Sequence, residues 1–516
     1  MLGDRQAMSD TADTGSAYDE RTKFRVLVVT VLSAGLVFLD TSVATVALRS
    51  IQADLGISTS AVQWVASGYL LTLSALLLVG GRIADIFGRR RMWRIGLVSY
   101  AIMSCIAALS PNGPFLIAVR ALQGVAGAVL VPTTLALINS VYPPAERGKA
   151  IGTWAAWSGI MTLIGPVLGG VIIDNLTWRF AFLLSPVLAL VALALSRPVP
   201  ESRDEDADRR LDFAGVALVA FAIGGMVFAL VQGPVSGWTS PLVIGSAAVG
   251  AALVPAFLWW ERRSASPVMP FAMFEDRNLA VANLVTLFVY AGLYGTFFYV
   301  SLYTQSSLGL SATAAGALYI PNTILLFFLS PYAGRLNDRF GPRWLMCFGP
   351  LTSAVGLVIM SMTGPGQILT VLIPGIVVFG IGLGFTVTPV TATAIGAAQR
   401  RFSGIASGFN NAVSRIAGLV AIALMGVIVV QLWHSSLALS AASAPAPVVT
   451  KLESVRDKAF VLPSPSGLSA ADAADVHARA LAAARGSFRD GVWLAAAFVA
   501  MGGIVSGVGI RPKRAS

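Results

Sequence analysis

The sequence has little of what builds metal centres, disulfide frameworks or redox sites. Its 516 residues include two cysteines, Cys105 and Cys347, and two histidines, His434 and His477. Both cysteines lie inside apolar runs, without the paired spacing of a zinc site or a disulfide framework. Both histidines fall in one segment near the C-terminus, where we expect them to be solvated. We therefore expect no metal and no other cofactor.

Charge is also scarce. Asp, Glu, Lys and Arg make up 12% of the residues, which is about half the fraction in a typical soluble domain. Hydrophobic residues reach 56%, and the mean hydropathy is +0.76. Such a chain cannot cover a surface that faces water, but it can cover one that faces lipid. It also lacks a GxxxxGK[ST] phosphate loop, so ATP is not the expected energy source. We expect a polytopic membrane protein and not an enzyme.

Long apolar runs predict the number of membrane spans, because a helix needs about twenty apolar residues to cross a bilayer. Fourteen such runs occur, near 26–48, 62–81, 93–109, 115–139, 148–173, 180–197, 213–232, 241–260, 280–304, 312–333, 344–362, 368–393, 402–431 and 488–510. Charged breaks at 196–212 and 261–278 set the seventh and eighth runs apart from the others. Residues 1–25 and 511–516 are predicted to be cytoplasmic tails.

The basic residues predict the orientation in the cell membrane. With both termini in the cytoplasm, Arg49 and Arg179 are the basic residues that fall in short outside loops, as the positive-inside rule requires. The net charge of +11 therefore indicates membrane orientation and not nucleic-acid binding. A long outside loop is predicted over 432–487, and its stretch 468–486 has the pattern of an amphipathic helix. This loop is either a lid or partner site, or a loosely ordered tether.

An internal repeat divides the chain into two halves. Residues 81–90 read GRIADIFGRR and residues 334–343 read GRLNDRFGPR, and both segments join the second span of a half to its third. At a nearly constant offset, GAVLVP at 127–132 matches GFTVTP at 384–389. The duplication predicts an N-terminal six-helix bundle over 26–197, two inserted helices within 198–279, and a C-terminal six-helix bundle over 280–510. Transporters with parallel repeats bind substrate between their halves.

The motifs resemble those of the major facilitator superfamily, and more closely its drug–proton antiporter family with fourteen spans. The matching segments are LDTSVATVAL (39–48), GGRIADIFGRRR (80–91), RALQGVAG (120–127), GPVLGG (165–170) and WRFAFLLSP (178–186). Met161 departs from the antiporter pattern, which usually has a further glycine there. The resemblance implies an all-α major facilitator fold that exports drugs, antibiotics or dyes in exchange for protons. It also implies a monomer. A transporter of a lipid or a specific small metabolite on the same scaffold is the alternative.

By this resemblance the repeated loops form a conformational latch. Its residues are Gly81, Arg82, Asp85, Gly88, Arg89 and Arg90 in the first loop, and Gly334, Arg335, Asp338 and Gly341 in the second. We expect Asp85 and Asp338 to accept hydrogen bonds from the start of a neighbouring helix and to oppose its dipole. The arginines can form charge-assisted bonds with carboxylates. The alternative is that these charges only anchor the loops in the cytoplasm.

Asp40 and Arg120 are the candidates for proton coupling. Both fall inside predicted spans of the first half, where a charge costs several kcal/mol unless it is paired or hydrated. The resemblance assigns Arg120 to coupling, and Asp40 is our candidate carrier. A static Asp40–Arg120 pair that holds the first and fourth spans together is the alternative.

The fifth span carries the antiporter motif. Its glycines allow helices to approach closely and its proline interrupts the backbone ladder; the residues are Gly152, Gly165, Pro166, Gly169 and Gly170. We expect a bending helix that seals the protein against leak, or one that is simply tightly packed.

The predicted substrate cavity has few charges and several aromatic and amide groups. The candidates are Gln63, Trp64, Gln123, Trp154, Trp157, Tyr290, Tyr294, Tyr299, Asn322, Asn410 and Arg415. Apolar walls with sparse polar groups suit lipophilic ligands, and aromatic rings can hold cations. Aromatic side chains that face lipid are the alternative for many of them.

Overall fold

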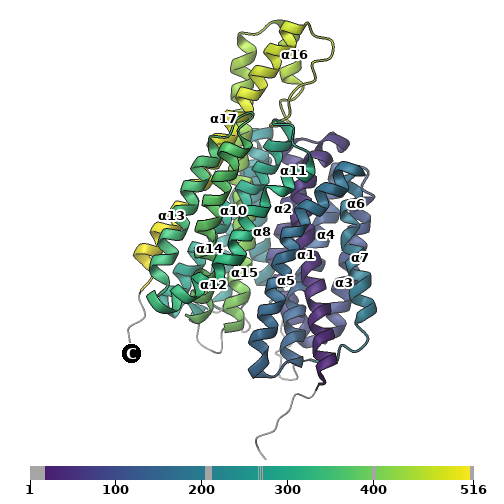
Figure 1. The fold of residues 1–516 in the computed structure, drawn as a ribbon, viewed down its shortest axis with the longest axis vertical. Helices are drawn as coiled ribbons and strands as arrows, with labels where there is room; N and C mark the ends of the chain where they lie inside the picture. Colours follow the sequence, from purple (N-terminus) through teal and green to yellow (C-terminus); the bar gives the residue numbers. More distant parts are fainter. Residues whose placement is uncertain are drawn as a thin grey trace, which may run out of the picture.

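A computed structural model describes residues 18–203, 212–264, 267, 269, 271–397 and 403–511. These residues form helices and no strand, so the all-α prediction is confirmed. The helices run side by side in one bundle, and a helical hairpin projects beyond one end of it (Figure 1). The start of the first helix and the end of the last lie at the opposite end (Figure 1). We call these two ends the hairpin end and the terminal end.

The first group of helices precedes the charged break. It comprises α1 (Glu20–Leu55), α2 (Thr59–Phe87), α3 (Arg89–Ala108), α4 (Gly113–Val141), α5 (Pro144–Asn175), α6 (Trp178–Phe182) and α7 (Leu184–Leu195). Within it, α2 packs on α4, α1 packs on α5, and α3 packs on α4. Asp19 and Asn112 each accept a backbone hydrogen bond at the start of α1 and α4, which fixes where these helices begin.

The remaining helices are a central pair and a second group. The pair is α8 (Phe213–Ser236) and α9 (Pro241–Glu261). The second group comprises η1 (Phe271–Glu275), α10 (Arg277–Ser306), α11 (Ala312–Ala317), α12 (Tyr319–Phe340), α13 (Pro342–Ser361), η2 (Ile368–Leu372), α14 (Ile373–Gly396), α15 (Ser403–Ala442), α16 (Ala446–Glu453) and α17 (Ala470–Gly509). Helix α8 contacts both α2 and α15. The central pair therefore lies against one seam between the two groups.

Twelve helical segments among the described residues are long and apolar enough to cross a membrane. Helix α3 is not one of them, because four arginines in its first six residues lower its hydropathy. Helix α5 contributes only the shorter apolar stretch Ile160–Asn175. The multi-pass membrane fold is thus confirmed, while the count of fourteen spans and the boundaries of the two bundles stay predictions.

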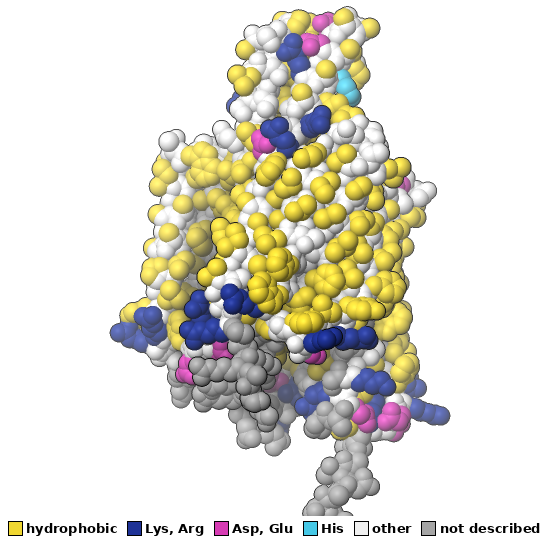
Figure 2. Space-filling model, turned by 60° about the vertical axis from the view of Figure 1, so that its left-hand side comes forward, with side chains coloured by type: hydrophobic (Ala, Val, Ile, Leu, Met, Phe, Trp, Pro, Cys, Tyr) yellow, Lys and Arg dark blue, Asp and Glu magenta, His cyan; other side chains and the backbone are white. Residues whose placement is uncertain are grey.

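The surface has the polarity of a protein surrounded by lipid. Hydrophobic side chains cover the middle of the face shown in Figure 2, and Lys and Arg gather toward the terminal end and on the projecting hairpin. Large apolar side chains such as Leu190, Phe221 and Phe328 are exposed. A bilayer solvates such a belt, whereas water would not.

Helix replaces most of the predicted outside loop. Helix α15 extends to Ala442 and α17 begins at Ala470, so the predicted amphipathic stretch is the first half of the last helix. The alanine-rich sequence favours helix. Arg479 of α17 pairs with Asp475 at 2.8 Å and donates to the Ser440 carbonyl of α15 at 2.9 Å. The projecting hairpin is therefore an ordered structure, which removes the loosely ordered tether as an interpretation.

The hairpin also touches the first group of helices. The backbone N–H of Thr59, in the first turn of α2, donates to the Asp457 carbonyl at 2.8 Å. In return the Thr59 hydroxyl accepts from the Ala459 N–H at 2.7 Å. Phe460, next in the chain, is fully buried at a positive φ of 72° and packs edge-on against Tyr303. The segment after α16 thus bridges the two groups at the hairpin end.

Candidate functional site

Three buried side chains form a closed polar triangle between α1 and α4. Arg120 Nη1 lies 2.6 Å from Asp40 Oδ2 and donates to Gln123 Oε1 at 2.7 Å. Gln123 Nε2 donates to Asp40 Oδ1 at 3.1 Å. The side chains of Arg120 and Asp40 are 1% and 2% exposed. Both carboxylate oxygens are therefore occupied, so any proton exchange at Asp40 requires these contacts to open.

Further contacts of Arg120 and Gln123 connect the triangle to α2 and α3. The Arg120 guanidinium lies 4.3 Å from the centre of the Tyr69 ring, and its Nε donates to the Val65 carbonyl at 3.4 Å. The Tyr69 hydroxyl is 3.3 Å from that of Tyr100. Gln123 also donates to the Ser104 hydroxyl of α3 at 3.3 Å. The triangle therefore contacts four helices, and a rearrangement of its hydrogen bonds would change the contacts of all four.

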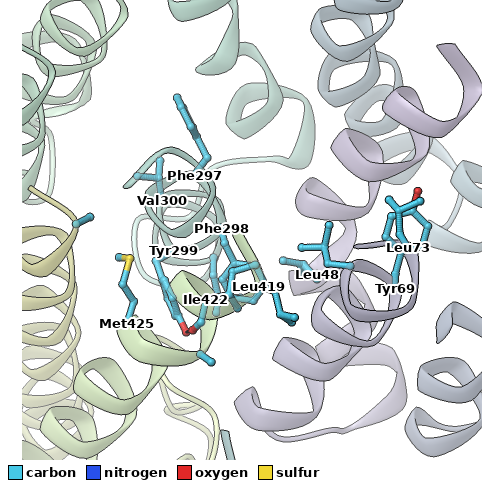
Figure 3. Close-up of a cluster of buried hydrophobic side chains, with 14 of the residues drawn as sticks. Leu48, Tyr69, Leu73, Phe297, Phe298, Tyr299, Val300, Leu419, Ile422 and Met425 are labelled. Carbon is cyan, nitrogen blue, oxygen red and sulfur yellow. Dashed lines mark hydrogen bonds between the residues drawn. The ribbon is translucent and has the colours of Figure 1, made fainter. Parts of the chain in front are cut away.

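A cavity of about 40 Å³ lies beside the triangle, between the two groups of helices. Its wall comes from α1, α2, α4, α10 and α15 and is formed by Thr41, Ala44, Thr45, Leu48, Val65, Ala66, Tyr69, Leu70, Arg120, Tyr294, Phe298 and Ile422. Figure 3 shows Leu48 of α1 opposite Phe298 and Ile422 of the second group. The sequence predicted Tyr294 as a cavity residue and Arg120 as a coupling residue. The apolar members were missed, because the sequence of a span does not show which face its apolar residues occupy.

Three predicted cavity residues lie at contacts between helices. Gln63 of α2 donates to the Tyr299 hydroxyl of α10 at 2.8 Å, which joins the two groups. Asn410 of α15 donates to Asn283 and to Thr286, both on α10. Asn322 is buried against Gly380 of α14, and its Oδ1 has no hydrogen-bond partner within the described residues.

The predicted tryptophans differ in how deeply they are buried. Trp64 packs its ring 6.0 Å from that of Phe228 on α8, at the seam with the central pair. Trp157 on α5 is 51% exposed. Trp154, one turn earlier, is buried. Neither Trp64 nor Trp157 lines the described cavity.

At the hairpin end, the two groups are joined by hydrogen bonds. Asp174 at the end of α5 accepts from the backbone N–H groups of Ala312 and Thr313 at 2.9 and 2.8 Å, at the start of α11. Ser301 and Gln305 of α10 donate to carbonyls of α1 at 3.0 and 3.1 Å. The sequence did not predict this contact of Asp174. The residue stands alone after the antiporter motif, and the helix that it contacts begins more than a hundred residues later in the chain.

Glycines of the predicted antiporter helix lie at close contacts with two different helices. Gly165 and Gly169 face α1, where an added methyl group would meet Ser42 and Val43 respectively. Gly170 faces the backbone of α11, and the Pro166 carbonyl lies against Gly316 of the same helix. Gly152 differs, because a methyl group there would meet nothing within 4 Å. The motif thus allows close packing of α5 on α1 within the first group, and of α5 on α11 between the two groups.

The first repeated loop is held by two carboxylates, one within the loop and one from the charged break. Asp85 pairs with the Arg89 side chain at 2.8 Å. Glu201, from the charged break, accepts from the backbone N–H groups of Arg90 and Arg91 at 3.0 and 3.1 Å. Glu201 occupies the start of α3, since the chain after α7 returns to this loop, and the role of Asp85 in a latch stays a prediction. Arg82 lies near the end of α2.

The two repeated loops have similar backbone conformations but different side-chain contacts. Gly88 and Gly341 both have positive φ, 102° and 77°, which favours glycine at this position of each repeat. Gly81 faces Pro132 of α4, and Gly334 faces Thr388 of α14 in the same way. In the second loop, however, Asp338 and Arg335 are exposed, and Arg335 stacks on the ring of Tyr332.

We expect Glu201→Ala to loosen the start of α3. Loss of a carboxylate that caps two backbone N–H groups costs about 1 kcal/mol, so the amides of Arg90 and Arg91 should exchange hydrogen roughly fivefold faster. Hydrogen–deuterium exchange with mass spectrometry measures this. The control is Glu453→Ala at the end of α16. Unchanged exchange in the first loop would show that Glu201 does not hold it.

The family model described as Major Facilitator Superfamily matches residues 30–422 and 282–510 of the chain. Curated relatives include Multidrug resistance protein Stp of Mycobacterium tuberculosis (strain CDC 1551 / Oshkosh), 33% identical over 79% of this chain and 76% of that protein. Puromycin resistance protein pur8 of Streptomyces alboniger is 34% identical over 78% and 81%. Tetracenomycin C resistance and export protein of Streptomyces glaucescens is 29% identical over 76% and 73%.

Solved structures share the fold. A bacterial homolog of the human lysosomal transporter Spinster, crystallised in an inward-facing and unoccupied conformation, superposes with a TM-score of 0.69 at 15% identity. The match covers 96% of this chain and 100% of that one. At this identity the likeness concerns the fold alone.

Proposed function

Because the chain belongs to the Major Facilitator Superfamily, we propose that it exports lipophilic or amphiphilic small molecules, such as drugs or antibiotics, in exchange for protons. The family assignment makes the chain a multi-pass membrane transporter and not an enzyme. Export is proposed because relatives that match over three quarters of the chain are named for drug or antibiotic resistance, and one for export.

Proton coupling is proposed on one observation, the buried triangle of Asp40, Arg120 and Gln123 beside the cavity. Its carboxylate contacts a guanidinium that also lines the cavity wall. A substrate or a rearrangement that draws Arg120 away would leave Asp40 with one amide, and burial without a cation favours the protonated form of a carboxyl group. Rejoining of the pair would release that proton. Arg120 would act as the coupling residue and Asp40 as the carrier.

The orientation follows from the basic residues. Lys and Arg gather toward the terminal end (Figure 2), so we place that end in the cytoplasm and the hairpin end outside. The hydrogen bonds of Asp174, Ser301 and Gln305 would then close the outer end of the protein. In alternating access these contacts open to release substrate, while the repeated loops at the terminal end act as the latch of the opposite state. We propose that a monomer suffices.

We expect substrate-dependent proton movement in liposomes that hold the protein and an internal pH dye. A proton gradient would be imposed and a panel of neutral and charged lipophilic drugs added. Wild type should move protons with at least one drug, and Asp40→Asn should abolish this movement because the carrier is gone. The control is Asp490→Asn, a carboxylate on α17 that pairs with the neighbouring Arg489.

Either failure is informative. Proton movement that survives in Asp40→Asn removes Asp40 as the carrier and leaves it a structural partner of Arg120. The absence of drug-linked proton movement in wild type contradicts antiport.

A further inference from the structure

Arg415 is a buried cation on the face of α15 that meets the first group of helices. It is 3% exposed and is the one Lys, Arg, Asp or Glu residue of that helix. Leu419, one helical turn later, and Ile422 face Leu48 of α1 in Figure 3. Residues four apart share a helix face, so Arg415 faces the same junction. Its guanidinium lies 5.1 Å from the centre of the Phe38 ring on α1.

The guanidinium of Arg415 has no acceptor within the part of the chain that the structure describes. Among those residues its guanidinium interacts with the ring of Phe38. Arg120 differs sharply, since it contacts the Asp40 carboxylate, the Gln123 amide and the Val65 carbonyl. A buried charge without a partner costs several kcal/mol. An arginine in such a position is explained if a bound ligand supplies the missing hydrogen-bond acceptor.

Two further donors without acceptors lie around it. Tyr290 and Tyr294 of α10 have ring centres 6.1 Å apart, and neither hydroxyl has a hydrogen bond to a described residue. The Tyr294 ring packs directly on Gly418 of α15 and lines the cavity. Tyr290 packs against a cluster that includes Ala417, two residues after Arg415 on α15. A guanidinium, two phenol groups and the Phe38 ring therefore surround one region of the junction.

We infer that Arg415, Tyr290 and Tyr294 form a subsite that binds an acidic or oxygen-rich group of an aromatic substrate, such as a carboxylate or a phenolate. The guanidinium supplies charge-assisted hydrogen bonds to that group, and the three rings pack against the substrate's own aromatic system. This inference rests on the proposed function for its meaning in export, but it concerns binding alone.

The charges around the junction favour the same class of substrate. The buried charged side chains there are Asp40, Arg120 and Arg415, and Asp40 is already matched by Arg120. The unmatched charge is thus positive. A lipophilic cation would be repelled by Arg415, although the aromatic residues alone had suggested that cations could be held there. An anionic or acceptor-rich aromatic compound meets no such penalty.

Two dyes with the same ring system test this subsite. Fluorescein is anionic and rhodamine 123 is cationic at neutral pH, and both are xanthenes. Their binding to the purified full chain in detergent would be measured by fluorescence anisotropy, without any gradient. We expect wild type to bind fluorescein at least about tenfold tighter than rhodamine 123. Because a hydrogen bond to a charged group contributes to affinity at this level, Arg415→Gln should weaken fluorescein binding about 10- to 100-fold.

The controls separate recognition from folding. Arg415→Lys should retain part of the preference for fluorescein, because it keeps the charge but not the planar donor geometry. Arg49→Gln, on α1 near the hairpin end, should leave both affinities unchanged. Thermal unfolding should show Arg415→Gln at least as stable as wild type, since an unmatched buried charge is removed.

Three results would overturn the subsite: equal or tighter binding of rhodamine 123 by wild type, no binding of either dye, or an unchanged ratio of affinities in Arg415→Gln. The subsite and the antiport mechanism can fail independently, because dye binding tests the first and proton movement tests the second. An Arg415-dependent preference without drug-linked proton movement would contradict the antiport mechanism and leave the subsite standing.

Discussion

Arg120→Met is expected to destabilise the folded protein by about 3–5 kcal/mol, the cost of breaking a buried ion pair from one side. Asp40 would keep only its hydrogen bond from Gln123 and would be left charged without a cation, or would take up a proton permanently. In either case substrate-dependent proton movement should be lost. Thermal unfolding in detergent and the liposome assay measure the two effects.

A double variant separates the structural effect from coupling. Asp40→Leu combined with Arg120→Met replaces both charges by apolar groups, and such replacements of buried pairs are often neutral or stabilising. We expect the double variant to unfold near the wild-type temperature, yet to move no protons. Recovery of proton movement together with stability would show that the pair is a static link between α1 and α4.

The second large effect is expected from Gly170→Val. A side chain at Gly170 meets the backbone of Ala312 and Thr313 on α11, and a backbone cannot move aside as a flexible side chain can. The valine should therefore push α5 and α11 apart at the hairpin end and reduce drug export by tenfold or more, because the outer closure fails. Gly316→Val, on the other side of the same contact, should have the same effect.

The measurement is access from outside to a cysteine introduced at Thr45, whose carbonyl accepts from Ser301 in this closure. A membrane-impermeant thiol reagent should label it slowly in an otherwise wild-type chain and several-fold faster with Gly170→Val. Gly152→Val is the matched control on the same helix, since it meets no neighbouring atom. Equal labelling of both valine variants would contradict a closing role for Gly170.

Charge inside a span was the most informative sequence signal for the site. Asp40 and Arg120 stood out in the sequence because a charge inside a span must be paired or hydrated, and the structure places them 2.6 Å apart. Gln123 was assigned to the cavity and instead completes their triangle. A side-chain amide is uncharged and does not require an ion-pair partner in a span. The sequence therefore did not indicate that Gln123 bonds Asp40 and Arg120.

Contacts made by ordinary acids at helix ends could not be predicted. Glu201 stands in a break that contains several acids with similar neighbours, and only the return of the chain places it at α3. Asp174 depends in the same way on where α11 lies. The burial of aromatic residues could not be predicted either. Trp154 is buried and Trp157 is exposed, although both have the same hydropathy.

The projecting hairpin has a practical consequence for imaging. A bundle of two repeated halves looks nearly the same after half a turn about the membrane normal, and a detergent micelle hides most of its surface. The helical extensions of α15 and α17, with α16 between them, stand outside the bundle and belong to one half alone (Figure 1). In electron micrographs of single particles they would mark both the hairpin end and the second group of helices, so that particle orientations can be assigned without an added antibody fragment.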